Sequence, residues 1–264
     1  MGSSNAVAGI DIGYSKKRRS SAVCLITWDD ESIDWEIRRY RATDSERLET
    51  IRGLLGSQSL RSVAFDGPLR SGCDVIGEYR AAERVLTRYL GTRIGKPGQS
   101  SSPVGIRLNE EANNCVEIVR YVANVAPSPS RIGIAGQCIV EAFPSSYLGL
   151  MIRDPESLGT IRKNRSDKFF EVLNYDGTLL RLLGYLLPHR RTVRDFREVK
   201  NHDERASLVC AMTALGFAIG RYCAVGDENG WIILPPCTFI ERWAHDLLRK
   251  NRIDDTVSGW VCCD

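Results

Sequence analysis

The sequence predicts an α/β fold in which a mixed sheet of five strands is flanked by helices. Apolar runs of strand length alternate with amphipathic helical runs along most of the 264 residues. Three of the apolar runs have the same ending, one carboxylate followed by a glycine or proline break: Val7–Gly13 with Asp11, Arg61–Leu69 with Asp66, and Cys138–Pro144 with Glu141. A lone carboxylate is costly to bury. We therefore expect these acids to be paired or to hold a metal ion.

The first half of the chain predicts the centre of the sheet. Val7–Gly13, Ser21–Trp28 and Ile33–Tyr40 have the composition of strands, and the third alternates apolar and charged residues. Their short links favour an antiparallel meander. A helix from Thr43 to Gly56 then leads to the strand Arg61–Asp66, which this crossover returns parallel to the first strand. Asp11 and Asp66 should therefore lie close together.

This order of elements, with an acid on the first and fourth strands, is that of the ribonuclease H-like fold. The remaining segments predict helices, a loop, a fifth strand and a further short strand. They are helices over Gly77–Gly91 and Asn109–Val125 with the loop Gly95–Gly105 between them, a fifth strand in Arg131–Phe143, a long helix over Asp203–Val225, a short strand in Gly226–Pro235 and a last helix over Thr238–Lys250. We expect one domain over residues 1–264. Within it, residues from about 145–200 form an inserted cap of helices and loops.

Composition limits the class of protein. The net charge is +3 and the pI near 8.4, which favours a polyanionic partner only weakly. No apolar run has membrane-spanning length, so no membrane partner is expected. Nine cysteines, mostly within apolar runs, are typical of reduced core residues and indicate a cytoplasmic protein. No Cys/His spacing indicates a zinc site, and Cys262-Cys263 is not a Cys-x-x-Cys pair.

Four carboxylates are candidate catalytic residues and ligands of Mg²⁺ or Mn²⁺, because hard divalent cations take oxygen ligands. Asp11 would bridge two ions, Asp66 and Glu141 would each hold one, and Asp203 would complete the set from the start of its helix. Structural roles remain open: an arginine partner or cap for Asp11, an Asx turn for Asp66 and an N-cap for Asp203. His202 is either a structural histidine, which we favour, or a group that polarises the attacking water.

The chain resembles the family catalogued as domain of unknown function 429, predicted nucleases with a ribonuclease H-like core. The resemblance spans nearly the whole chain. It lies in Gly9-Ile-Asp11, Phe65-Asp66-Gly-Pro-Leu69, the helix with Arg80, Glu83 and Arg84, the Ser-rich loop after it, Glu141-Ala-Phe-Pro144, Asn201-His-Asp203, and Gly226-Asp through Leu234-Pro235. Members often carry a second aspartate one turn after the His-Asp pair. Ala206 occupies that position here, so Asp203 or Glu204 would serve alone.

The sequence thus predicts a metal-dependent nuclease that hydrolyses phosphodiester bonds in DNA or RNA. Candidate phosphate contacts are Lys16, Arg80, Arg84, Lys96 and Ser101. A protein partner or a homodimer is also compatible with the sequence. Two alternatives remain: a catalytically weak module that binds nucleic acid or protein on the same fold, and a phosphotransferase similar to actin-like ATPases and sugar kinases, which open with a similar strand and Asp-x-Gly turn. Carboxylate-dependent Mn²⁺ binding would favour the nuclease, and stabilisation by ATP would favour the phosphotransferase.

Overall fold

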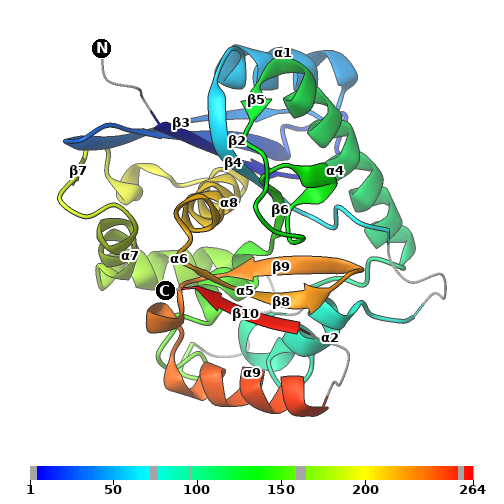
Figure 1. The fold of residues 1–264 in the computed structure, drawn as a ribbon, viewed down its shortest axis with the longest axis vertical. Helices are drawn as coiled ribbons and strands as arrows, with labels where there is room; N and C mark the ends of the chain where they lie inside the picture. The colour runs from blue at the N-terminus through cyan, green and yellow to red at the C-terminus, as the bar shows by residue number, and fades with distance from the viewer. Residues whose placement is uncertain (1–4, 72–76, 96, 159–164, 255–258, 264) are drawn as a thin grey trace.

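A single twisted sheet runs through the molecule and carries helices on both faces (Figure 1). The computed structural model describes residues 5–71, 77–95, 97–158, 165–254 and 259–263. Among these residues ten strands form one sheet, in the order β10-β8-β9-β6-β4-β1-β2-β3-β7, and β5 pairs with β4. The prediction of an α/β fold with a mixed sheet is confirmed, whereas the prediction of five strands is wrong.

The centre of the sheet follows the sequence prediction. The strands β1 (Asn5–Asp11), β2 (Ser21–Trp28) and β3 (Ser32–Tyr40) form an antiparallel meander. Helix α1 (Asp44–Leu55) then returns the chain to β4 (Ser59–Asp66), which pairs in parallel with β1. Because the two strands run in the same direction, they end at the same edge of the sheet.

The fifth predicted strand is shorter than expected. The strand β6 covers only Ile139–Ala142 and lies parallel to β4 on the side away from β1. The residues before it form an isolated bridge between Pro127 and Gln137 and a short 3₁₀ segment, η1 (Ile134–Gly136). Ala135 has a φ of 50° inside this segment, so the chain cannot continue as an extended strand there.

The C-terminal part of the chain differs from the prediction. The long apolar helix α8 covers His202–Ile219 and stops at Gly220, whose φ of 74° is the left-handed conformation typical of a helix end. The apolar residues after it, predicted as helix, form strand β8 (Tyr222–Asp227) instead. The short strand predicted in Gly226–Pro235 is confirmed as β9 (Gly230–Leu234). Three further strands that were not predicted complete the sheet: β10 (Gly259–Cys263), β7 (Arg191–Thr192) and β5 (Asn124–Val125).

The predicted helices are present with shifted bounds. The helix expected over Gly77–Gly91 is limited to α2 (Ala81–Thr87), which is followed by α3 (Gly91–Ile94). Helix α4 (Pro103–Val122) begins within the predicted loop, because the Ser102 side chain caps it and Pro103 occupies its first turn. The other helical segments are α5 (Pro144–Gly149), α6 (Arg165–Tyr175), α7 (Thr178–Leu186), η2 (Phe196–Glu198), η3 (Cys237–Phe239) and α9 (Arg242–Asp254).

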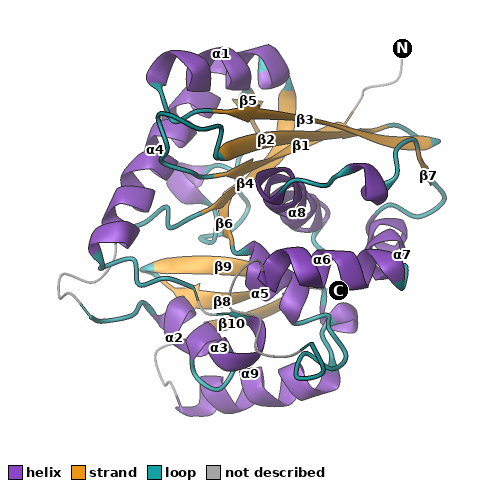
Figure 2. Cartoon of the chain, turned by 180° about the vertical axis from the view of Figure 1, so that it is seen from behind, coloured by secondary structure: helices purple, strands orange, loops and turns teal. Residues whose placement is uncertain are grey.

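Helix α8 is the buried centre of one face. It packs against β1, β2 and β4, with helices α5, α6 and α7 on its other side (Figure 2). Its close approach to the sheet depends on Gly9 in β1. A Cβ at that position would lie 2.0 Å from the Ala211 nitrogen and 2.3 Å from the Ser207 oxygen. Since Asp11 is two residues after Gly9 in the same strand, it points to the same face as α8.

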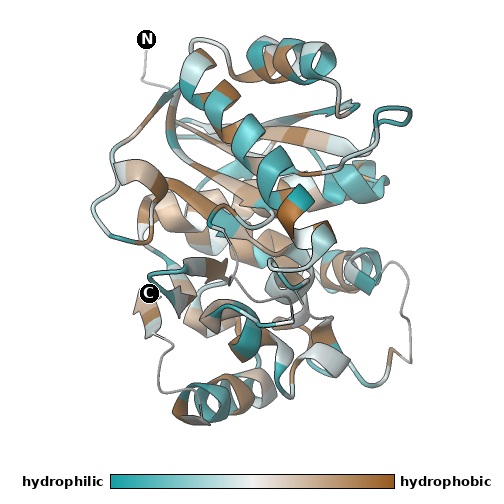
Figure 3. Ribbon diagram, turned by 90° about the vertical axis from the view of Figure 1, so that its right-hand side faces the viewer, coloured by the Kyte–Doolittle hydropathy of each residue, from teal (hydrophilic) through white to brown (hydrophobic). Residues whose placement is uncertain are grey.

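Hydrophobic residues concentrate along the central strands, and the outer helices show mixed faces (Figure 3). This pattern places one continuous core on both sides of the sheet. In the part of the chain that the structure describes, no helix combines the length and the hydrophobicity that crossing a bilayer requires.

Candidate functional site

Two aspartates meet at one end of the central strands. Asp11 is the last residue of β1 and Asp66 the last residue of β4, and the two are direct partners in the parallel register. Side chains of register partners in neighbouring strands lie on the same face. Their carboxyl groups form a hydrogen bond with one another. Asp11 is buried and Asp66 is half-buried.

Burial and mutual repulsion oppose ionisation of this pair. The pKa of Asp66 is raised to about 7, chiefly by burial, although His202 and the hydrogen bond from Asp11 act in the opposite direction. The pKa of Asp11 is raised well above its usual range by burial first, then by the negative charges of Asp66 and Asp203, with Arg39 opposing. Among the described residues, no cationic side chain forms a salt bridge with either carboxylate of the pair.

A third aspartate reaches the pair from helix α8. Asp203 lies in the first turn of the helix, where its backbone N–H donates to the side chain of the N-cap residue Asn201 at 2.9 Å. Its carboxylate accepts a hydrogen bond of 2.6 Å from Nη2 of Arg39 on β3. The structure thus brings three of the four predicted acids together. It adds Arg39, which sequence reasoning missed.

The row of register partners across the sheet explains the position of Arg39. Asp66, Asp11, Ala22 and Arg39 are successive partners on β4, β1, β2 and β3, so all four point to the α8 face. Ala22 carries only a methyl group between the acid and the arginine. The long guanidinium side chain therefore has room to extend above β2 and reach Asp203 at the start of α8.

His202 forms a second polar contact at this end of α8. Its Nδ1 lies 3.1 Å from Oδ1 of Asp167 on helix α6, and its side chain is 53% exposed. It is close enough to Asp66 to lower the pKa of that carboxyl group. Arg205, one turn further along α8, also approaches Asp167, at 3.6 Å. Asp167 was not a predicted site residue, because nothing in a polar helix distinguishes it from its neighbours.

Glu141 does not belong to this cluster. On β6 it is the partner of Phe65 and not of Asp66, so its side chain lies on the face opposite to the aspartate pair. There both of its oxygens accept hydrogen bonds of 2.9 Å from the guanidinium of Arg80, and the backbone N–H of Leu69 donates to it at 2.9 Å. Arg80 also donates to Glu83, at 2.9 Å. All three charged side chains are buried.

This buried ion pair contradicts two predicted roles. Glu141 has no oxygen available to share a metal ion with Asp11 and Asp66, because its carboxylate is held in a bidentate contact with an arginine. Arg80, which is 3% exposed, is a partner of Glu141 and not a phosphate contact. The predicted set of four acids is therefore reduced to three.

The other predicted phosphate contacts lie in different environments. Lys16 is exposed in the turn between β1 and β2. Arg84 is half-buried and donates to the carbonyl of Tyr79 at 2.6 Å. Ser101 is buried, and its hydroxyl donates to the carbonyl of Glu78 at 2.7 Å, which makes it a structural residue and contradicts its predicted contact with substrate. Lys96 lies outside the described residues.

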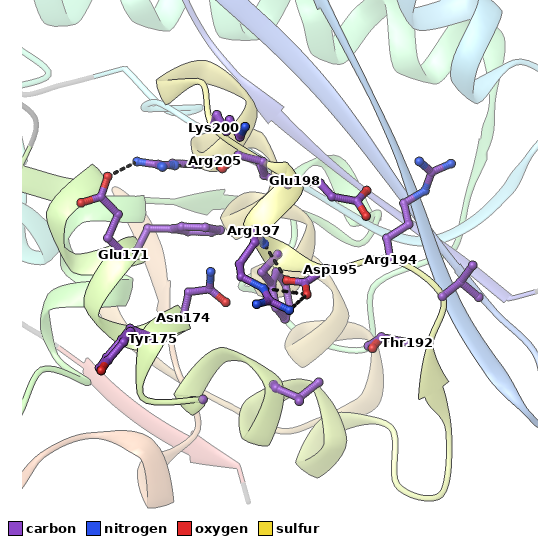
Figure 4. A pocket seen from close by; sticks show the side chains of 16 residues that line it. Glu171, Asn174, Tyr175, Thr192, Arg194, Asp195, Arg197, Glu198, Lys200 and Arg205 are labelled. Carbon is purple, nitrogen blue, oxygen red and sulfur yellow. Dashed lines mark hydrogen bonds and ion pairs between the residues drawn. The ribbon is translucent and has the colours of Figure 1, made fainter.

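Two cavities lie near these groups. A cavity of about 260 Å³ borders the end of β4 and is lined by Asp66, Gly67, Pro68, Arg80, Glu141 and the loop segment 97–100, among others. A larger one of about 960 Å³ lies between α6, α7 and the segment after β7 (Figure 4). Its arginines are largely paired with acids: Arg197 with Asp195 at 2.5 Å and Arg205 with Glu171 at 3.1 Å. We therefore place the candidate site at the aspartate pair.

Comparison of the chain with models of protein families, with curated proteins and with solved structures finds no match. The interpretation of the site consequently depends on its own geometry and chemistry.

Proposed function

We propose that the protein is a metal-dependent nuclease in which Asp11 and Asp66 hold a divalent cation, Mg²⁺ or Mn²⁺. The observation that carries this proposal is the pairing of a buried and a half-buried carboxylate at the ends of adjacent parallel strands, without a salt bridge to a cationic side chain among the described residues. Two carboxylates in contact cannot both ionise without compensating positive charge. Hard oxygen ligands of this kind fit Mg²⁺ or Mn²⁺, which are commonly bound by one or two carboxylates.

The order of the central strands supports the same proposal. The run β3-β2-β1-β4-β6, with an antiparallel meander followed by parallel strands, is the arrangement expected of a ribonuclease H-like core. In such a core the acids at the ends of the first and fourth strands are the metal ligands that the resemblance implies. A fold alone does not establish an activity, so the proposal depends on the aspartates.

Each residue of the cluster has a distinct task in the proposed reaction. Asp11 and Asp66 would bind the cation, and Asp203 would add negative charge from the α8 side while Arg39 holds its carboxylate in place. When bound, the ion would lower the pKa of a water molecule and stabilise charge on the phosphate. His202, oriented by Asp167 and largely exposed, is positioned to accept a proton from water.

The exposed turn after β1 is the part of the surface best suited to a phosphate backbone. Lys16, Lys17, Arg18 and Arg19 follow closely on Asp11 and are all exposed. Basic side chains beside a metal site attract nucleic acid and position its backbone, without reading its sequence. This turn supports DNA or RNA as the substrate class and does not separate the two.

A non-catalytic binding module is the second candidate, and specific observations favour it. Ala206 stands where related nucleases often have another aspartate, and Glu141 is held by Arg80. The phosphotransferase alternative gains no support. Gly13, expected to approach nucleotide phosphates, has its N–H bonded to the Ser21 hydroxyl at 3.0 Å. A Cβ on Gly13 would lie 1.9 Å from the Ser20 carbonyl, so the turn is packed onto the start of β2.

The test is a cleavage panel of single-stranded, double-stranded and branched DNA and RNA with Mg²⁺ or Mn²⁺. We expect the wild type to cut at least one substrate, and Asp11→Asn to lose more than about 100-fold in rate, beyond the usual effect of residues that only orient metal ligands. The matched control is Asp30→Asn, because Asp30 is an exposed carboxylate on the β2–β3 turn. Wild-type protein that binds nucleic acid but cuts none would favour the binding module.

A further inference from the structure

Three cysteines and a histidine converge near the C-terminal end of the chain, far in sequence from the aspartate pair. Cys223 lies on β8, Cys237 in η3, His245 on α9 and Cys262 on β10. The sulfur atoms of the three cysteines all lie within 4.8 Å of one another. Nε2 of His245 is 3.0 Å from Sγ of Cys237. Three segments thus bring three sulfur ligands to one place, and His245 lies beside this group in contact with Cys237, from where a side-chain adjustment would bring it in as a fourth ligand.

Strand register explains how two of these side chains meet. Cys223 and Cys262 are direct partners on the antiparallel strands β8 and β10, so their side chains point to the same face, with 3.1 Å between the sulfurs. This separation is longer than the S–S bond of about 2.05 Å in a disulfide, so the two thiols are in contact without a covalent bond between them. The adjacent residue Cys263 pairs with Tyr222 and points to the opposite face.

The ligand chemistry of the cluster selects the metal. Thiolates are soft ligands that favour zinc over magnesium or manganese, and three cysteines with one histidine is a common set for structural zinc. With Zn–S bonds of about 2.3 Å, tetrahedral geometry places sulfurs about 3.8 Å apart. The three sulfurs lie within 4.8 Å of one another, and those of Cys223 and Cys262, at 3.1 Å, would separate slightly to accept the ion. Arg249 and Arg252 line a small cavity together with His245.

We propose that Cys223, Cys237, His245 and Cys262 bind one Zn²⁺ ion in a closed tetrahedral site. Four protein ligands leave no position for water, so the site is structural and not catalytic. It joins β10, whose residues are only partly buried, to β8 and to the ends of α9 and η3 (Figure 1). The ion would secure this edge strand and the last helix to the sheet, in place of a larger apolar interface.

The site is tested first on the full-length wild-type protein, so that no variant needs to fold. After metal removal under reducing conditions, titration with Co²⁺ should produce the intense visible bands typical of tetrahedral thiolate coordination, with saturation at one ion per chain. Zn²⁺ should then displace Co²⁺ and abolish these bands. Weak octahedral bands only, or a Cys223–Cys262 disulfide in freshly purified protein detected by mass spectrometry, would overturn the proposal.

Variants identify the ligands. Cys237→Ser and His245→Ala should each lose bound zinc, whereas Cys263→Ser, on the same strand as Cys262 but on the opposite face, should retain it. His245→Cys should keep the ion with shifted Co²⁺ bands, because a fourth thiolate replaces the imidazole. Circular dichroism of each variant separates loss of metal from loss of fold. Retention of stoichiometric zinc in both Cys237→Ser and His245→Ala would overturn the assignment.

Discussion

Two carboxylates on neighbouring strands, Glu141 and Asp66, differ in their partners: an arginine neutralises the first, and a second acid faces the other. Asp66 is the last residue of β4 and precedes Gly67, whereas Glu141 is the next-to-last residue of β6 and lies three residues before Pro144. Glu141 lies opposite Phe65 in the register, on the face where Arg80 neutralises it. Asp66 lies opposite Asp11, where a second acid repels it.

The difference shows that an acid in the protein interior indicates a functional site when no cationic side chain neutralises its charge. The Glu141 pair satisfies its own charge and stabilises the junction of β6 with α2, so it needs no ligand. The aspartate pair holds a proton that the solvent would take from an ordinary aspartate, because the charged form is unfavourable in this environment. Perturbed acids of the second kind are the ones expected at functional sites.

The largest expected effect is a loss of stability when the ion pair between Glu141 and Arg80 is broken. Glu141→Gln leaves the buried guanidinium of Arg80 with one acidic partner, Glu83, in place of two. Loss of one partner from a buried ion pair typically costs about 3–5 kcal/mol of unfolding free energy. Urea unfolding should detect this loss. The matched control is Glu117→Gln, whose exposed pair with Arg120 at 3.2 Å should cost less than about 1 kcal/mol.

The second prediction concerns the stabilisation that a bound metal ion gives at the aspartate pair. Mn²⁺ at about 100 times its dissociation constant should stabilise the wild type by roughly 2.7 kcal/mol, and Asp66→Asn should remove this gain. Because binding requires the carboxylates to lose their shared proton, Mn²⁺ affinity should rise with pH up to about 7, the pKa of Asp66. Thermal unfolding with and without Mn²⁺ measures both. An equal gain in wild type and Asp66→Asn would place the cation elsewhere.

A third prediction concerns stability and pH in the absence of metal. The folded chain keeps the proton of Asp66 up to a pKa of about 7, whereas in the unfolded chain the carboxyl has its ordinary value, 3.8. The folded state thus binds more protons between these values, so stability falls as pH rises through this window.

Asp66→Asn should remove the part of that decline that Asp66 causes, while the part that the buried Asp11 causes remains. It should be more stable than wild type at pH 8 by about 2 kcal/mol, half of what the full pKa difference implies because Asp66 is partly exposed. Urea unfolding from pH 4 to pH 8, roughly the range where Asp66 loses its proton, measures how the unfolding free energy of each of the two proteins changes with pH. Parallel slopes for the two proteins would contradict the raised pKa of Asp66.

The smallest expected effect tests whether Asp203 is a structural acid neutralised by Arg39 or a member of the metal-binding cluster. Its pair with Arg39 is partly exposed, 30% at the arginine and 16% at the aspartate, so Arg39→Gln should cost no more than about 1 kcal/mol. Equilibrium unfolding measures the change. A loss as large as that expected for Glu141→Gln would show that Asp203 is a compensated structural acid and not part of the metal-binding cluster.

Much of the central fold follows from local sequence. Short links require β1, β2 and β3 to form a meander, and the α1 crossover returns β4 in parallel, so Asp11 and Asp66 end at the same edge. Local pattern was less informative where one apolar run contains two elements. The junction of α8 and β8 is marked in the sequence only by Gly220 and Arg221, and the left-handed turn at Gly220 separates the helix from the strand.

By itself the sequence determined which segments are strands at the centre of the sheet, their order, and the presence of acids at their ends, because these depend on neighbouring residues and link lengths. Only the tertiary structure decided which acids share a face, because the register of β6 is a long-range property that one residue of offset reverses. The same holds for the Arg39–Asp203 contact and for the Cys223, Cys237, His245 and Cys262 cluster, whose members are distant in sequence and meet only when β8, β10 and α9 pack.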